Sequence, residues 1–198
     1  EVIKVILEKR PANTNAYILS DTCPVCNQQV FHPEDEVVAR CQNMECTAQI
    51  KGRIEHFVSK NCMDIDGFGI KLVDQLVDTG IIHNVADIFL LNLEQLSELE
   101  RMAEKSAHNI MTSIETAKST TMSRFVHGLG IRNVGEHASK ILEKSFGGNL
   151  DILMQAKVQD LTVIHEIGEI MAKSIVNFFS DTSNQRVVQE CMESGIQF

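Results

Sequence analysis

The chain has 198 residues, of which 43% are hydrophobic and 23% charged, as in an ordinary globular protein with one large or two small domains. It contains no Trp and no apolar run near the ~20 residues that a membrane span requires, and its first residues lack the pattern of a signal peptide. Its net charge of −9 would usually argue against nucleic-acid binding, and its first residue, Glu1 rather than Met, suggests a piece of a longer chain.

The N-terminal segment predicts the end of a β-containing domain. Residues 2–8 hold the apolar runs Val2-Ile3 and Val5-Ile6-Leu7, which indicate a β-strand, and residues 11–15 indicate a loop. We expect this strand to be the remnant of a domain that is otherwise absent, with a boundary near residue 20.

Four of the six cysteines form a metal-site pattern. Cys23-x2-Cys26 and Cys41-x4-Cys46 are two close pairs separated by 14 residues, a spacing typical of structural zinc sites. The residues between the pairs suffice for a short hairpin that returns the second pair to the first. Four thiolates complete a tetrahedral shell, so we expect structural Zn²⁺ in a zinc finger over residues 21–54. The alternative, two disulfides in a secreted scaffold, is disfavoured because a signal peptide is lacking.

The other thiols and imidazoles show no catalytic pattern. Cys62 and Cys191 stand in apolar helical contexts and are interpreted as buried core residues. His32 could replace a cysteine, but the four thiolates already complete the shell, so a place on the hairpin surface is expected. Four further histidines are interpreted as packing or surface residues: His56, His127, His137 and His165. The sequence also lacks a paired-carboxylate site, a nucleophile elbow and a P-loop.

A fourfold repeat with a spacing of 32 to 34 residues occupies the rest of the chain. Each copy has an apolar residue inside a turn and a small residue that closes it, and small or apolar residues follow at four and seven positions, on one helix face. The centres are Ile65-Asp66-Gly67-Phe68-Gly69, Leu99-Glu100-Arg101-Met102-Ala103, Ile131-Arg132-Asn133-Val134-Gly135 and Ile164-His165-Glu166-Ile167-Gly168. The repeat predicts a helix, a tight hairpin and a second helix in every copy, and a mainly α fold.

The repeat has a second level of organisation. Apolar segments that begin at Asp87 and Asp151 precede copies two and four and indicate connector helices, while Gly80 and Gly147-Gly148 indicate helix ends. Copies one and two therefore form a unit of about residues 55–118, and copies three and four a unit of about residues 119–198. We expect one tandem helix-hairpin-helix domain, because a single pair of hairpins buries a small core.

Glycine hairpins of this kind can bind phosphate. Gly tolerates positive φ, its missing side chain lets backbone amides approach a ligand, and the first N–H groups of the following helix attract an anion. Such contacts are independent of base sequence. The candidate DNA-binding residues belong to copies one and three and include two neighbouring cations: Gly67, Phe68, Gly69, Lys71, Arg132, Asn133, Val134 and Gly135.

Copies two and four are expected to be structural partners. Copy two has Arg101 and Ala103 in place of glycines, and copy four places the Glu166 carboxylate where a phosphate would approach. Asp64 and Asp66 also flank the first hairpin and oppose what its backbone offers. Basic residues outnumber acidic ones over residues 40–60 and 124–144, whereas acidic residues dominate residues 87–104, so one side is expected to meet DNA despite the negative net charge.

Six short motifs cover nearly the whole chain and point to one family. They are Cys23-Pro24-x-Cys26, Arg40-Cys41-x-Asn43-x-x-Cys46-x-Ala48-Gln49, His56-Phe57-Val58-Ser59, Met63-Asp64-Ile65-Asp66-Gly67-Phe68-Gly69, Glu104-Lys105-Ser106-Ala107 and Leu129-Gly130-Ile131-Arg132-x-Val134-Gly135. Together they resemble the C-terminal half of bacterial NAD⁺-dependent DNA ligase, in which a four-cysteine zinc finger precedes four helix-hairpin-helix motifs.

The resemblance implies a fold, cofactors and partners. Residues 1–20 would be the exit from an OB-fold domain, residues 21–54 a zinc finger, and residues 55–198 a helix-hairpin-helix domain that grips duplex DNA through the minor groove near a nick. In this family a lysine is adenylated from NAD⁺, AMP passes to the 5′-phosphate, and the 3′-hydroxyl displaces it. The parent enzyme uses NAD⁺ and Mg²⁺, and Zn²⁺ is structural.

The resemblance also implies that this chain is not catalytic alone. The adenylated lysine belongs to a Lys-x-Asp-Gly motif that the sequence lacks, and Asp64-Ile65-Asp66-Gly67 has no lysine at the required spacing. The adenylation domain, most of the OB fold and the BRCT domain would be partners on the same polypeptide. The expected location is the bacterial cytoplasm, at the nucleoid, without a membrane.

Two other functions remain alternatives. A non-enzymatic helix-hairpin-helix module of a repair or recombination factor would bind DNA structure without ligation, and a protein-interaction domain would use the acidic face. The four-cysteine pattern ahead of the hairpins and the N-terminal strand favour the ligase.

Overall fold

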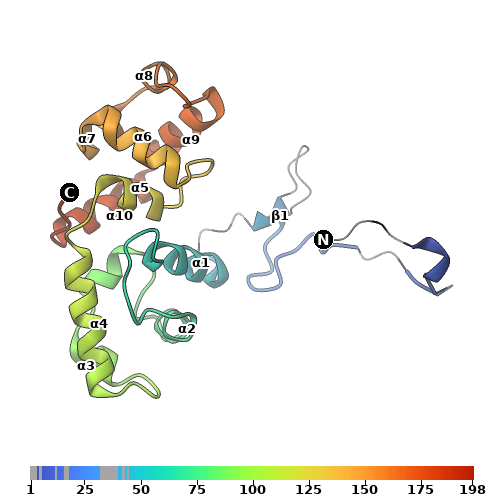
Figure 1. The fold of residues 1–198 in the computed structure, drawn as a ribbon. Coiled ribbons are helices and arrows are strands. Elements are labelled where there is room, and N and C mark those ends of the chain that lie inside the picture. The colour runs from blue at the N-terminus through green and yellow to red at the C-terminus, as the bar shows by residue number, and fades with distance from the viewer. Residues whose placement is uncertain are drawn as a thin grey trace. The chain divides into compact units, whose positions relative to one another are not determined.

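The computed structural model describes residues 4, 6–11, 13–15, 18–31, 40, 41, 43 and 45–198. The chain divides into two compact units, Glu1–Cys46 and Thr47–Phe198, here called the N-terminal unit and the helical unit (Figure 1). The division falls ahead of the predicted boundary at residue 54, because helix α1 (Thr47–Val58) buries Ile54 and Phe57 in the core of the helical unit.

The N-terminal unit holds little regular structure in its described residues. A short 3₁₀ helix, η1 (Leu7–Lys9), covers the end of the segment predicted as a strand, so that prediction is wrong at Leu7 and Glu8. The apolar residues Val2, Ile3 and Val5 lie outside the described residues. Strands β1 (Val30–Phe31) and β2 (Arg40–Cys41) pair antiparallel, which confirms a hairpin between the cysteine pairs. Its predicted tip, including His32, lies outside the described residues.

The helical unit contains the four predicted helix-hairpin-helix motifs. Its elements after α1 are α2 (Ile70–Asp78), η2 (Ala86–Leu90), α3 (Leu93–Ser97), α4 (Glu104–Ala117), α5 (Met122–Gly128), α6 (Glu136–Phe146), α7 (Leu150–Gln155), α8 (Val158–Thr162), α9 (Glu169–Ser180) and α10 (Thr182–Glu193). The hairpins join α1 to α2, α3 to α4, α5 to α6 and α8 to α9. Elements η2 and α7 are the predicted connectors, so the mainly α fold is confirmed.

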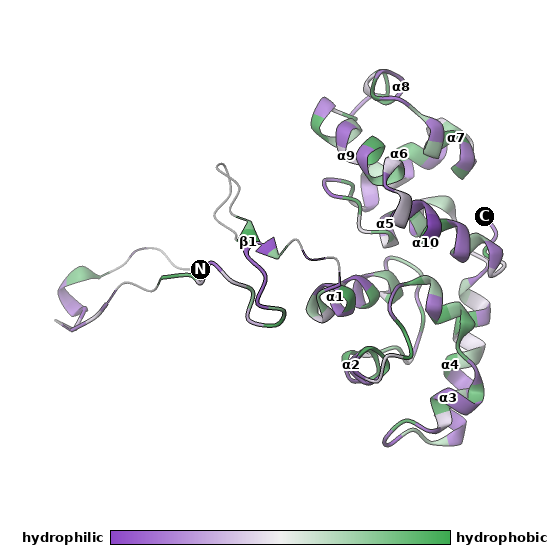
Figure 2. Ribbon diagram, turned by 180° about the vertical axis from the view of Figure 1, so that it is seen from behind, coloured by the Kyte–Doolittle hydropathy of each residue, from purple (hydrophilic) through white to green (hydrophobic). Residues whose placement is uncertain are grey.

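The helix faces predicted from the repeat are buried. The residues four positions after each turn are fully buried: Val73, Ala107, Ser139 and Ala172. The residues seven positions after each turn are at most 3% exposed: Leu76, Ile110, Leu142 and Ile175. One hydrophobic cluster extends from Ile54 to Ile196, so both pairs of hairpins share a core. Figure 2 shows hydrophobic and hydrophilic residues interspersed along these helices, as expected when each helix buries one face.

Glycines end two of the helices as predicted. Gly80 follows α2 with φ of +70°, and its amide donates to the Val77 carbonyl. Gly147 and Gly148 follow α6 with φ of +61° and +73°. These left-handed conformations satisfy carbonyls at the helix ends and turn the chain toward the connectors.

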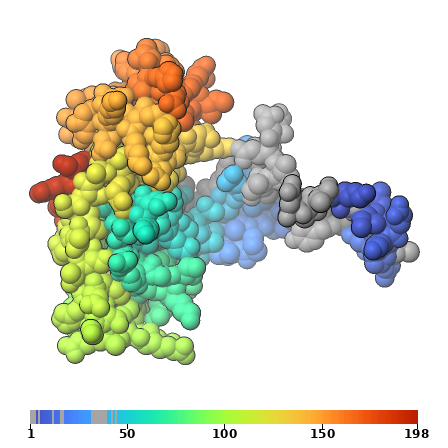
Figure 3. Space-filling model, viewed as in Figure 1, coloured from blue at the N-terminus to red at the C-terminus, as the bar shows by residue number. Residues whose placement is uncertain are grey.

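The C-terminal segment closes the helical unit. Helix α10 lies outside the fourfold repeat, and the residues after it return to the junction between the two pairs of hairpins. There the Gln197 amide donates to the Lys118 carbonyl at 2.8 Å, and the Phe198 ring lies 5.5 Å from the Phe125 ring. Figure 3 shows the two pairs of hairpins as adjoining blocks of the helical unit. Among the helices of the described residues, none has the length and apolar character needed to cross a membrane.

Candidate metal centre and nucleic-acid interface

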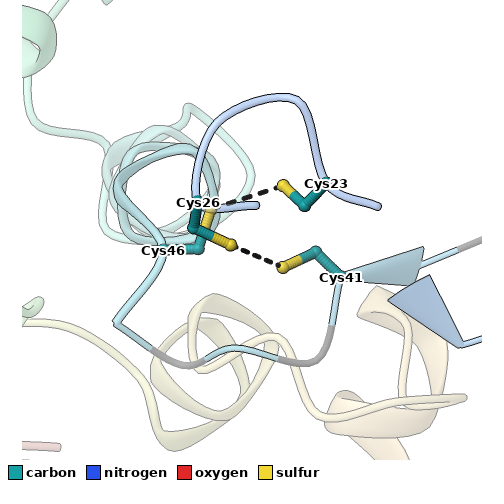
Figure 4. Close-up of side chains that lie close together, drawn as sticks. All are labelled: Cys23, Cys26, Cys41 and Cys46. Carbon is teal, nitrogen blue, oxygen red and sulfur yellow. Dashed lines mark hydrogen bonds between the residues drawn. The ribbon is translucent and has the colours of Figure 1, made fainter. Parts of the chain in front are cut away.

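The four predicted zinc ligands lie together in the N-terminal unit (Figure 4). The Sγ atoms of Cys23 and Cys46 are 3.9 Å apart, those of Cys26 and Cys41 are 3.5 Å apart, and all four sulfurs lie within 4.8 Å of one another. A tetrahedral Zn²⁺ with Zn–S bonds of about 2.3 Å would separate its sulfurs by about 3.8 Å. All six cysteines are free thiols, so the structure does not support the alternative of two disulfides.

Two tight turns position the thiols. In the first, the Cys23 amide donates to the Gln28 carbonyl at 2.8 Å, and Asn27 adopts a φ of +57°. In the second, the Cys46 amide donates to the Asn43 carbonyl at 3.1 Å. Strand β2 carries Cys41 and pairs with β1, which brings the second turn back to the first.

The surroundings of Cys26 favour its thiolate. The Gln28 backbone amide and the Asn43 side chain donate hydrogen bonds toward its sulfur and lower the pKa of Cys26 to about 6. Cys23 and Cys46 are buried, so the cluster is shielded from water on that side. The residues fit Zn²⁺, which would be held by four protein ligands as a structural centre with no open position.

The four hairpins share one backbone conformation. The third residue of each turn has positive φ, and the next amide donates to the carbonyl three residues earlier at 3.0 to 3.4 Å. The positive φ angles are +85° at Gly67, +63° at Arg101, +64° at Asn133 and +71° at Glu166. Replacement of glycine in copies two and four has therefore not changed the turn, although a non-glycine residue in this region costs about 1–2 kcal/mol.

The two glycines of a hairpin have different roles. Gly67 needs its positive φ, and a Cβ there would lie 2.8 Å from Ile110 Cγ1 on α4. Gly69, Gly135 and Gly168 have φ between −78° and −90°, which any residue can adopt. A Cβ on any of these three would meet nothing within 4 Å. The closing glycines are thus required by neither the backbone nor packing, and they leave open space beside the next helix.

The helices that follow the hairpins start without a capping side chain. Their N-cap residues are Gly69 for α2, Ala103 for α4, Gly135 for α6 and Gly168 for α9. An α-helix leaves its first N–H groups without intrahelical partners, and its dipole adds partial positive charge there. Each of the four helix starts therefore has a group of amides without a capping side chain, which suits an anion.

Two candidate DNA-binding side chains are buried. Phe68 is 6% exposed and Val134 5%, so these side chains anchor their turns in the core, and only the backbone at these positions can face a ligand. The other six candidates are exposed: Gly67, Gly69, Lys71, Arg132, Asn133 and Gly135.

Contacts between hairpins and helices hold each pair together. In the first pair, the Asp66 amide donates to Ser113 Oγ on α4 at 2.7 Å, and Gln75 Nε2 on α2 donates to the Glu100 carbonyl at 3.3 Å. In the second pair, Asn133 Nδ2 donates to Ser174 Oγ on α9 at 3.2 Å. Each hairpin thus rests on the second helix of its partner motif.

The carboxylate of the fourth hairpin has a partner that the sequence did not reveal. Glu166 Oε2 lies 2.9 Å from Nε2 of His137, a residue on α6 that had been interpreted only as packing or surface. The hydrogen bond from His137 lowers the pKa of the exposed Glu166 carboxyl. The Glu166 carboxylate therefore contacts His137 of the third motif, which lies 29 residues away in the sequence and close only in the folded chain.

Comparisons with known proteins agree with this architecture. The model of the NAD-dependent DNA ligase C4 zinc finger domain matches residues 22–48, the SAM-like helix-hairpin-helix tandem matches residues 61–116, and the helix-hairpin-helix motif matches residues 124–188. A DNA ligase of Lysinibacillus sphaericus (strain C3-41) is 43% identical over 196 residues, which are 99% of this chain and 29% of the relative. A DNA ligase of Legionella pneumophila (strain Corby) is 42% identical over 199 residues, which are 100% of this chain and 29% of the relative.

The chain thus spans about three-tenths of the length of these relatives. The zinc finger model is specific to one kind of ligase, and it stands ahead of the hairpins as the resemblance of the motifs implied. By this zinc finger, by the tandem hairpins and by its end-to-end alignment with DNA ligases, the chain matches the zinc-finger and helix-hairpin-helix part of an NAD-dependent DNA ligase.

Proposed function

We propose that this chain is the part of an NAD⁺-dependent DNA ligase that grips nicked duplex DNA independently of base sequence. The observation that carries the proposal is the set of four uncapped helix starts behind the hairpins, three of which have a closing glycine beside open space. Phosphate oxygens would accept hydrogen bonds from these amides, and such contacts position a duplex without reading bases.

Hairpins one and three are proposed as the main contacts. Lys71 and Arg132 are the exposed cations beside them, and Gly69 and Gly135 leave room for a phosphate. Hairpins two and four have the same backbone but poorer surroundings, since Ala103 has a Cβ and Glu166 adds negative charge. Their part is to hold hairpins one and three in place.

Zinc serves the fold of this part, whereas bond formation belongs to the remainder of the enzyme. The adenylated lysine, NAD⁺ and Mg²⁺ would be bound by an adenylation domain on the same polypeptide, together with an OB fold, to which residues 1–20 would belong, and a BRCT domain. The whole enzyme would act on DNA in the bacterial cytoplasm, at the nucleoid. This chain alone would bind DNA without ligating it.

Fluorescence anisotropy with labelled nicked and intact duplexes tests the proposal. We expect binding at low salt that weakens as salt rises, with a slope of about −0.9 per phosphate contacted. Absence of binding at low salt would exclude the gripping role. The non-enzymatic alternative is tested by adding the chain to a ligase that lacks this part: restored nick sealing supports the ligase, and binding without restoration supports the alternative.

A further inference from the structure

A second cluster of metal-ligating side chains lies within the helical unit, apart from the four zinc-finger cysteines. It consists of His56 on α1, Cys62 in the segment between α1 and the first hairpin, and His127 on α5. One donor atom from each residue lies within 4.8 Å of the donor atoms of the other two. Cys62 is fully buried, while the two histidines are half-buried, so an ion could reach the cluster from the histidine side.

One ring nitrogen of His127 has no hydrogen-bond partner among the described residues. This nitrogen, Nδ1, is buried. Burial lowers the pKa of His127, and the nearby Val134 backbone acts in the opposite direction. In the neutral tautomer that carries its proton on Nε2, Nδ1 has a lone pair available to an ion.

The distances suit a small divalent ion. His56 Nε2 lies 3.7 Å from Cys62 Sγ, and a tetrahedral Zn²⁺ with bonds of about 2.1 Å to nitrogen and 2.3 Å to sulfur would separate them by about 3.6 Å. His56 Nε2 also lies 2.8 Å from the His127 carbonyl oxygen, to which it donates in the metal-free arrangement. The gap of 2.8 Å has no room for an ion bonded at about 2.1 Å to the nitrogen on the same line, so the His56 ring must turn from the carbonyl when Nε2 binds an ion.

We propose that His56, Cys62 and His127 form a second metal site that takes Zn²⁺ or a similar borderline-soft divalent ion. On binding, the Cys62 thiol releases its proton to solvent and becomes a thiolate ligand, so one proton leaves for each ion bound. The His56 proton moves from Nε2 to Nδ1, which keeps the ring neutral and frees Nε2 for the ion. Arg124 and Glu136 are charged groups of opposite sign that act on Cys62.

The position of the site indicates what an ion would do. Cys62 leads into the first hairpin, and His127 lies near the end of α5, which leads into the third hairpin. A bound ion would therefore link the segments that carry the two hairpins proposed to contact DNA. Arg124 already makes a bridge at the same place, where its Nη2 donates to the Lys60 carbonyl at 2.8 Å. A metal ion at this site would thus cross-link the two pairs of hairpins, and the site is distinct from the zinc finger.

Metal stoichiometry of the purified full chain tests the proposal. Titration with Co²⁺, followed by thiolate-to-cobalt charge-transfer absorption, should give two ions per chain, and Zn²⁺ should compete for both. Cys62→Ser and His127→Gln should each reduce the count to one. Cys191→Ser is the matched control, because Cys191 is also a fully buried thiol and should leave the count at two. One ion per chain in the unsubstituted protein, or two in a folded Cys62→Ser variant, would overturn the proposal.

A second measurement does not depend on those substitutions. Cys46→Ser disables the zinc finger and should leave one Co²⁺ with an N₂S spectrum, distinguishable from the spectrum of a four-sulfur site. Excess Zn²⁺ should raise the melting temperature of the helical signal of this variant and leave unchanged that of a Cys46→Ser/His127→Gln variant. Ions bound only by exposed histidines would give no charge-transfer band, and that result would contradict the site.

Discussion

The four helices that follow the hairpins start without a capping side chain, whereas four other helices of the same unit start with one. Helices α3, α5, α7 and α10 have Asn92, Thr121, Asn149 and Asp181 as N-caps, and each side chain accepts a backbone hydrogen bond. Helices α2, α4, α6 and α9 have Gly69, Ala103, Gly135 and Gly168, and none of these offers a capping side chain. A capping side chain contributes about 1 kcal/mol relative to Ala and a few tenths relative to Gly.

This difference between capped and uncapped helix starts indicates which starts contribute to stability and which are available to a ligand. At the starts of α3, α5, α7 and α10, which follow no hairpin, a side chain satisfies a backbone amide, whereas the short helix α8 begins at Lys157 without a capping side chain. Where a hairpin precedes the helix, the amides are left for another acceptor, and the fold gives up some stability. The comparison therefore locates the ligand surface without reference to net charge, which at −9 points away from DNA.

The largest effect is expected when an uncapped helix receives a cap. In a Gly69→Asp/Gly135→Asp double variant, each carboxylate would accept from the free amides and occupy the place of a phosphate. We expect DNA affinity to fall about tenfold to a hundredfold, while the free energy of unfolding rises by about 0.5 kcal/mol per helix. Anisotropy and urea unfolding measure the two quantities. Ala103→Asp adds the same charge at the second hairpin, and an equal loss there would show that charge alone is responsible.

The next effect separates the two glycines of the first hairpin. Gly67→Ala would strain the left-handed turn and bring Cβ to 2.8 Å from Ile110 Cγ1, so we expect the free energy of unfolding to fall by about 2 kcal/mol. Gly69→Ala has an ordinary φ and open space around it, so unfolding should change by less than about 0.5 kcal/mol. Chemical denaturation compares the two, and similar losses would refute this assignment of roles.

The third prediction removes the capping side chain of a helix that follows no hairpin. Asp181 accepts from the Asn184 amide at 2.9 Å at the start of α10, which follows no hairpin. Asp181→Ala should lower the free energy of unfolding by about 1 kcal/mol and leave DNA affinity within about twofold. Thermal melts and anisotropy on the same sample check both. A marked loss of affinity without unfolding would place α10 on the DNA surface and weaken the comparison.

The sequence predicted the repeated parts of the molecule best. The zinc finger could be predicted because ligand spacing is local, and the hairpins because four copies share one buried stripe. Turn shape was harder to predict. Arg101 and Glu166 stand where copy one has glycine, yet their turns have the same left-handed backbone as the turn at Gly67. The preference of Arg and Glu for negative φ is overridden, because tertiary contacts of the hairpins stabilise the fold by more than the positive φ angles cost.

Contacts between distant residues could not be predicted from one sequence. The His137–Glu166 pair and the cluster of His56, Cys62 and His127 join residues that share no local period. The buried positions of Phe68 and Val134 did follow from the repeat, because an apolar residue lies inside every turn. Their inclusion among candidate binding residues came from the motif as a whole, and the structure restricts their contribution to backbone atoms.

The smallest expected effect concerns the fourth hairpin. Glu166→Asn keeps a residue that tolerates positive φ and removes the carboxylate beside the uncapped start of α9. DNA affinity should rise about twofold to threefold, because an exposed pair with His137 contributes little to stability.

The pH dependence of this effect follows from the pKa of Glu166. Since His137 lowers that pKa, the carboxylate stays ionised in the folded protein as pH falls to 4.5, the usual pKa of a glutamate. Its stabilising contribution is therefore present above that value and lost as pH falls through the lower, folded pKa. Anisotropy between pH 5 and 8 should find the same gain throughout, because the Glu166 carboxylate is ionised over that whole range. A loss of affinity would instead show that the Glu166–His137 pair orients the third hairpin for DNA.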